Sequence, residues 1–137
     1  MSQTSNHILA LDVGEKRIGL AQADTHTRFP FPLTTLTVDD MVISRLREII
    51  NEIAPVCLVV GYPRNQSGQP TQQTASVEAF AEELKAFRIP IVWQDESLTS
   101  VLAEDYLKSH KKTYTKADID AHAAAIILGD YLEANYA

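Results

Sequence analysis

The sequence predicts an α/β protein with a mixed five-stranded sheet flanked by helices, and three features support this. The stretch Ile8–Ala21 begins as a short apolar run, breaks at Gly14 and resumes from Ile18, which is typical of a two-stranded hairpin. Val56–Gly61 is a continuous apolar run, as in a strand that is covered on both faces. Apolar residues recur at helical spacing between later strands, so antiparallel strands are followed by parallel crossover units.

The first part of the chain is expected to contain three strands and one helix. Val13–Lys16 connects the two hairpin strands, and two prolines precede a β-favouring run, Leu33–Thr37, which we expect to lie near a sheet edge. Asp39 and Asp40 favour the start of a helix, because carboxylates there meet free N–H groups and the positive end of the helix dipole. Helical spacing continues to about Ala54 through Val42, Ile43, Leu46, Ile49, Ile50 and Ile53.

The second part of the chain is expected to alternate helices and strands. Gly61–Pro70 is rich in Gly, Pro, Asn, Ser and Gln, which is typical of a loop. The apolar spacing predicts a helix over Thr71–Phe87 and a short strand over Ile91–Gln94. A third helix is expected from residue 98 or 99 to about 108, and a last helix from residue 116 or 117 to about 135.

Composition limits the classes of protein that fit. A chain of 137 residues is most simply one domain over 1–137, large enough for a proper core. Cys57 is the only cysteine, which excludes an intrachain disulfide, and we expect both Cys57 and Trp93 to be core residues. The polar amino terminus lacks a signal-peptide pattern, and no apolar run approaches the roughly 20 residues that span a bilayer. We therefore expect a cytoplasmic protein with no membrane contact.

Two phosphate-binding motifs are excluded by the sequence. Gly14 and Gly19 have the spacing of a P-loop, but Leu20 and Ala21 occupy the positions that need Lys and Ser or Thr. No G-x-G-x-x-G motif occurs. The net charge of −6 also argues against a protein that binds nucleic acid through bulk charge.

Three acidic residues lie where strands or helices are expected to point into one cleft. Asp12 ends the first strand, Glu96 ends the last strand, and Asp120 lies one turn into the last helix. Asp95 should point to the opposite face from Glu96 because side chains alternate along a strand. Converging carboxylates repel one another, and a bound divalent cation relieves that repulsion. The alternative is that Glu96 caps the third helix and Asp120 interacts favourably with the dipole of the last.

Four segments, in chain order, resemble the signature segments of the YqgF family: DVGEKRIGLA, VVGYPRNQSG, DESLT and KADIDAHAAAIIL. The resemblance covers nearly the whole chain. It implies a ribonuclease-H-like fold and hydrolysis of nucleic-acid phosphodiesters with two Mg²⁺ or Mn²⁺ ions. Carried over position by position, the catalytic and metal-binding acids of the family fall on Asp12, Glu96 and Asp120, with Asp12 bridging both ions.

The resemblance also suggests that Lys16, Arg17 and Asn65 line the substrate cleft. Arg64 and Ser97 depart from the family pattern, which usually has Leu and Arg at these positions. Seven of the twelve Lys and Arg fall on segments expected near the strand carboxyl ends: Lys16, Arg17, Arg64, Lys108, Lys111, Lys112 and Lys116. The cleft can then be positive on an acidic protein. The residues that we expect to contact nucleic acid are Lys16, Arg17, Arg64, Asn65, Lys111, Lys112 and Lys116.

The substrate that the resemblance implies is precursor 16S rRNA, processed at its 5′ end during ribosome biogenesis, with ribosomal precursor particles as partners. A Holliday junction is the alternative substrate, and its cleavage would need a dimer with two catalytic centres. A non-catalytic RNA-binding module is a second hypothesis. A third is an ATP-handling protein, since the D-x-G hairpin also resembles the first phosphate loop of the actin and sugar-kinase superfamily; those proteins need two such domains. The sequence leaves monomer and homodimer open.

Overall fold

The computed structural model describes residues 6–63, 72–96, 99–110 and 113–136. These residues form one five-stranded sheet in the order β3-β2-β1-β4-β5. The antiparallel pairs are β1–β2 and β2–β3, and the parallel pairs are β1–β4 and β4–β5, so the predicted mixed sheet is confirmed. The strands are β1 (His7–Val13), β2 (Arg17–Asp24), β3 (Phe31–Thr37), β4 (Cys57–Pro63) and β5 (Ile91–Glu96).

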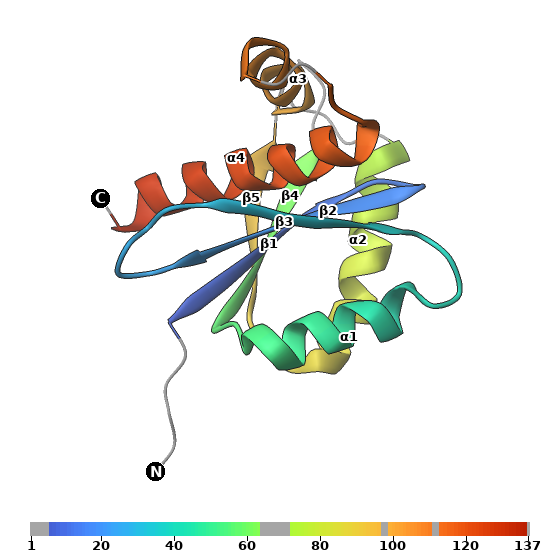
Figure 1. Ribbon diagram of the computed structural model, residues 1–137. Coiled ribbons are helices and arrows are strands. Elements are labelled where there is room, and N and C mark those ends of the chain that lie inside the picture. Colours follow the sequence, from blue (N-terminus) through green and yellow to red (C-terminus); the bar gives the residue numbers. More distant parts are fainter. Residues whose placement is uncertain (1–5, 64–71, 97–98, 111–112, 137) are drawn as a thin grey trace.

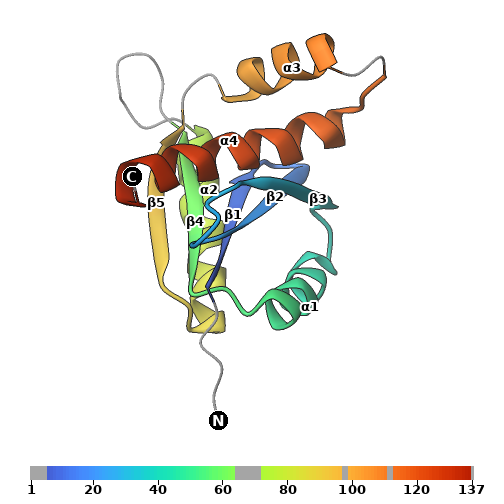
Figure 2. The same ribbon diagram turned by 60° about the vertical axis from the view of Figure 1, so that its left-hand side comes forward.

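Helices cover both faces of the sheet (Figures 1 and 2). The long helix α4 (Lys116–Tyr136) crosses one face, whereas α1 (Val42–Ile53) and α2 (Gln72–Leu84) lie on the other. A 3₁₀ turn, η1 (Lys85–Phe87), extends α2. Helix α3 (Thr99–His110) lies outside α4, on the side away from the sheet. No helix among the described residues is both long and apolar enough to span a membrane.

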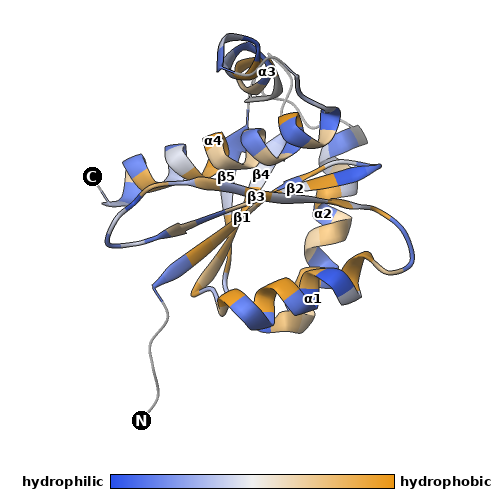
Figure 3. Ribbon diagram, in the orientation of Figure 1, coloured by the Kyte–Doolittle hydropathy of each residue, from blue (hydrophilic) through white to orange (hydrophobic). Residues whose placement is uncertain are grey.

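Alternation along the strands divides the core into two parts. Leu9 and Leu11 of β1 point toward α1 and α2, and Ile8 and Ala10 point toward α4. All four are fully buried, and much of β1 and α1 is coloured hydrophobic in Figure 3. Burying an Ile or Leu side chain stabilises the fold by about 1.5–3 kcal/mol. The central strand therefore anchors both layers of helices.

Helix α1 begins slightly later than its sequence pattern predicts. Asp39 does not start the helix; its Oδ1 accepts the N–H of Met41 at 2.9 Å, and its carboxylate pairs with Arg45 at 3.0 Å. The helix begins at Val42. Ala54 ends it with a left-handed φ of 51°, close to the predicted boundary.

The prediction that Trp93 is a core residue is wrong. Strand β5 forms an edge of the sheet, and 42% of Trp93 is exposed. Its ring instead packs edge-to-face against Tyr62 of β4, with centroids 5.1 Å apart. Cys57 is buried, as predicted.

Helix α4 lies very close to the sheet at Gly19 of β2. Gly19 is the antiparallel partner of Asp12 on β1. A Cβ atom at residue 19 would overlap the carbonyl of Asp120 and lie 2.9 Å from the backbone nitrogen of Ala121. The absence of a side chain therefore lets the backbone of α4 lie directly over the strand. This contact places Asp120 beside the end of β1.

We expect Gly19→Ala to lower the free energy of unfolding by at least about 2 kcal/mol, because the added methyl group meets backbone that cannot move without displacing α4. Gly129→Ala is the matched control, since its Cβ would make only ordinary contact, 3.6 Å from Pro30 Cγ. Alanine also favours the helix there, by about 0.5–1 kcal/mol. Urea unfolding followed by circular dichroism measures both, and equal effects would contradict the close approach.

Candidate active site

The three predicted acids come together on the face of the sheet that α4 covers. Asp12 follows Ile8 and Ala10 in the alternation of β1, so it points toward α4. Glu96 ends β5 on the same face, whereas Asp95 alternates to the opposite one. Asp120, on α4 itself, supplies the third carboxylate.

A second glycine makes room for Glu96. Gly61 belongs to β4, the strand between β1 and β5. A Cβ atom at this residue would lie only 2.7 Å from Glu96 Oε2 and 2.7 Å from Ile127 Cδ1. The space left by the missing side chain is therefore filled by the Glu96 carboxyl group, which lies between the sheet and α4.

Burial and neighbouring acids prevent Asp12 from ionising in the ordinary range. The pKa of Asp12 rises from 3.8 to about 9, chiefly because burial removes water from its carboxylate. The charge of Glu96, a hydrogen bond between the two carboxyl groups and the charge of Asp120 raise it further. Near neutral pH the Asp12 carboxyl thus carries a proton and donates it in a hydrogen bond to Glu96.

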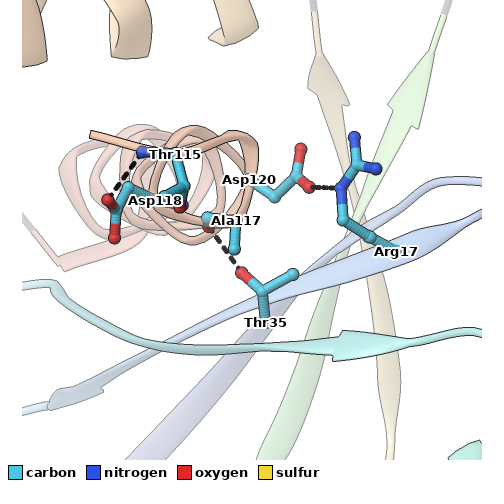
Figure 4. A network of polar contacts seen from close by, with 6 residues as sticks. All are labelled: Arg17, Thr35, Thr115, Ala117, Asp118 and Asp120. Carbon is cyan, nitrogen blue, oxygen red and sulfur yellow. Dashed lines mark hydrogen bonds and ion pairs between the residues drawn. The ribbon is translucent and has the colours of Figure 1, made fainter. Parts of the chain in front are cut away.

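Arg17 neutralises the third acid. Its Nε atom donates to Asp120 Oδ2 at 2.5 Å, between side chains that are 36% and 20% exposed (Figure 4). Arg17 is the first residue of β2, and its carbonyl accepts the N–H of Gly14 at 2.9 Å across the hairpin turn. The turn of the hairpin therefore fixes the position of the guanidinium group beside α4.

The first turn of α4 is held in place from two sides (Figure 4). Thr35 Oγ1 of β3 donates to the carbonyl of Ala117 at 2.6 Å. Thr115 and Asp118 form a reciprocal cap, in which each backbone N–H is donated to the side chain of the other residue, at 2.9 and 3.2 Å. These contacts fix the part of the helix that carries Asp120.

A cavity of about 330 Å³ opens beside Asp120. Lys16 and Arg17, which the resemblance assigns to the substrate cleft, line this cavity together with Glu15, and Lys116 is exposed at the start of α4. Gln73 of α2 also lines this cavity, although it was not selected from the sequence. Its position at the start of a helix is the only feature of the sequence that could have indicated this role. The predicted contacts Arg64, Asn65, Lys111 and Lys112, together with Ser97, lie outside the described residues.

The donor set suits a hard divalent cation, which takes oxygen ligands from carboxylates. As the side chains stand, the described residues contain no group of three or more His, Cys, Asp or Glu arranged to hold a metal ion. A proton on Asp12 and the guanidinium of Arg17 neutralise two of the three acids, Asp12 and Asp120. Metal binding would therefore require release of the Asp12 proton, because a metal ligand must be deprotonated.

Solved structures define the class of protein by its fold. RuvC of Thermus thermophilus, in complex with a Holliday junction substrate, aligns with a TM-score of 0.59 at 15% identity, covering 93% of this chain and 94% of that one. The Fowlpox virus resolvase, with Holliday junction DNA, aligns with a TM-score of 0.57 at 14% identity, covering 96% and 99%. The fold is therefore ribonuclease-H-like, as the resemblance implied.

Sequence comparison gives the family. The family model described as "RuvX: Holliday junction resolvase" matches residues 6–134. A Chloroflexus aurantiacus protein named "Putative pre-16S rRNA nuclease" is 42% identical, covering 93% of this chain and 86% of its own. A Roseiflexus protein of the same name is 37% identical, covering 97% and 98%. The chain belongs to the RuvX family, a family of nucleases.

We expect Asp12→Asn to stabilise the metal-free protein. The folded state keeps the Asp12 proton up to about pH 9, whereas the unfolded chain loses it near 3.8. The contribution of this carboxyl to the stability of the folded state is thus fully present below its pKa in the unfolded chain, and it is lost as the pH rises toward 9. An asparagine amide still donates to Glu96, so the free energy of unfolding should rise by about 1–3 kcal/mol at pH 8.

Urea unfolding in EDTA at pH 5 and pH 8 measures this effect, and the gain should be larger at pH 8. Asp40→Asn is the control, because Asp40 is exposed in the turn before α1 and should change stability by less than about 0.5 kcal/mol. If Asp12→Asn lowers the free energy of unfolding at both pH values, the buried carboxyl does not destabilise the folded state.

Proposed function

We propose that this protein is a metal-dependent endonuclease that hydrolyses nucleic-acid phosphodiesters, with Asp12, Glu96 and Asp120 as catalytic residues and metal ligands. The observation that carries the proposal is the convergence of three acids around a buried carboxyl whose pKa is raised to about 9. Such an arrangement is unfavourable for stability and is typical of functional sites. Membership of the RuvX family supports the same activity.

Each residue has a distinct task in the proposed site. Asp12, which interacts with both other acids, would hold two Mg²⁺ or Mn²⁺ ions, and Glu96 and Asp120 would complete their ligands. Paired divalent ions supply activation of the attacking water and stabilisation of the leaving oxygen. Lys16 and Arg17 line the adjacent cavity and would bind the substrate phosphates. Arg17 pairs with Asp120 and would lie beside any ion that this carboxylate holds.

We propose precursor 16S rRNA, cut at its 5′ end, as the substrate. The names of curated relatives at 37–42% identity support it. Branched DNA is the second candidate, supported by the description of the matching family model. Ribosomal precursor particles in the cytoplasm would be the site of action. We also propose that residues 1–137 form one domain. This domain would act as a monomer on RNA or as a homodimer on a junction.

We expect Asp12→Asn, Glu96→Gln and Asp120→Asn each to lower the rate of cleavage by at least about 100-fold, since even outer partners of a metal contribute 10- to 100-fold. The matched control is Asp95→Asn, which changes the neighbour of Glu96 on the opposite face of β5 and should keep its activity. Labelled precursor 16S rRNA and a four-way DNA junction are incubated with Mg²⁺ or Mn²⁺, and EDTA should abolish cleavage.

Cleavage of RNA but not of the junction would identify the substrate, and the reverse would favour the second candidate. Equal cleavage by Asp12→Asn would contradict the proposed chemistry. Full binding of RNA without cleavage by the wild-type protein under all metal conditions would favour the non-catalytic alternative.

A further inference from the structure

A second and larger cavity, of about 790 Å³, lies on the other side of α4 from the acids. Its walls come from the segment before and along β3, from the end of α3 and from the first two turns of α4. The residues that line this groove are Phe29, Pro30, Pro32, Leu33, Thr34, Thr35, Tyr106, Leu107, His110, Ala117, Asp118, Ala121 and His122. Its volume falls within the range of small-molecule sites, roughly 300–1,000 Å³.

Three aromatic rings are stacked along one wall of this groove. Tyr106 of α3 stacks on His110, with ring centroids 4.0 Å apart and planes 13° from parallel. It also stacks on His122 of α4, at 4.3 Å and 16°. Two imidazoles cannot share one face of a phenol ring at these separations, so Tyr106 lies between them. The stack therefore runs from α4 through α3 and ends at His110.

The end of the stack is oriented and open. His110 Nδ1 lies 2.9 Å from the carbonyl oxygen of Tyr106, a contact that fixes the ring, and His110 is exposed. The segment before and along β3 contributes apolar side chains to the lining: Phe29 is 57% exposed and is followed by Pro30, Pro32 and Leu33. A planar group that entered the groove would therefore meet both aromatic and apolar side chains.

The groove adjoins the proposed catalytic centre through α4. Ala117, Asp118, Ala121 and His122 line the groove at the helix spacing of one face, whereas Asp120 points to the other flank. The two flanks are about one helix diameter apart, roughly 10–12 Å. Among the groups beside the groove, Lys108 and Lys116 are exposed cations, and the Asp118 carboxylate caps the helix through Thr115.

We propose that this groove binds unpaired bases of the single-stranded part of the substrate, which stack on His110 and the rings behind it. Stacking on aromatic side chains is available to every base, because each has a π-face. The strand would cross the start of α4 from the acids to the groove, so that bases are held a few nucleotides from the bond that is cut. This inference rests on the proposed function and adds a site of recognition to it.

The experiment measures binding in EDTA, where no cleavage occurs, so that it does not depend on the catalytic proposal. Fluorescence anisotropy compares labelled 12-nucleotide single strands of RNA and of DNA with abasic strands of the same length. The full-length protein should bind strands with bases about 10-fold or more tightly than abasic strands, since stacking typically contributes a factor of 5 to 150 per base.

Substitutions at the end of the stack separate stacking from charge. His110→Ala and His110→Lys should remove the preference for strands with bases, whereas His110→Phe, which keeps a flat ring, should retain it. Leu102→Ala is the matched control on the exposed surface of α3 outside the groove and should bind as wild type. Thermal unfolding confirms that each variant is folded.

Several outcomes would overturn the inference. The first is that the wild type binds abasic strands and strands with bases equally well. The second is that His110→Ala still prefers strands with bases. The third is that His110→Lys keeps full affinity while His110→Phe loses it. A dimer in sedimentation that dissociates on His110→Ala would assign the groove to a second copy of the chain. If the wild-type protein fails to cleave any substrate but still binds strands with bases more tightly than abasic strands, only the catalytic proposal is refuted.

Discussion

The close contact between α4 and β2 is the constraint on which the rest of the structure depends. Gly19 has no side chain, so the carbonyl of Asp120 can lie where a Cβ atom would otherwise be. Gly19 is also the cross-strand partner of Asp12, and the same contact therefore closes α4 over the end of β1. The burial of Asp12 and the position of Asp120 depend on this approach, and Gly61 of β4 makes the corresponding room for Glu96.

Closing a helix over several carboxylates creates an electrostatic cost, which a proton and a cation reduce. One acid keeps its proton, and another is paired with Arg17. Both devices are reversible, because a proton can dissociate and a partly exposed guanidinium can turn to another anion. Stability would be greater with fewer acids in this position, and retaining them is the pattern expected where activity rather than stability is selected.

Much of the fold could be predicted from the sequence, because hydrophobic period is a local signal. The apolar run of β1 and the helical spacing of α1 identified these elements within a few residues. Alternation placed Glu96 and Asp95 on opposite faces. The exposure of Trp93 could not be predicted, since it depends on β5 being an edge strand, and the order of strands is a property of the whole sheet.

The same distinction applies to the candidate site. Three acids could be selected from their places at the ends of elements, and the resemblance selected the same three. The residues that set the positions and pKa values of these acids could not be selected from the sequence. Arg17 and Asp120 are 103 residues apart, and Gly19 and Gly61 make their contacts with other elements. The groove lined by Phe29 and Tyr106 likewise exists only after α3 has packed on α4.

The net charge of −6 is compatible with nucleic-acid binding once these two sites are considered together. Phosphate contacts need positive charge only locally, and Lys16 and Arg17 place two cations at the cavity, whose lining also includes Glu15 and Asp120. Stacking of bases on an aromatic surface needs none. A protein that combines a cavity carrying Lys16 and Arg17 with an aromatic groove across one helix would prefer strands with accessible bases over duplex, because a fully paired helix presents phosphates but hides the faces of its bases. Selection among nucleic acids would then depend on unpaired segments rather than on bulk charge.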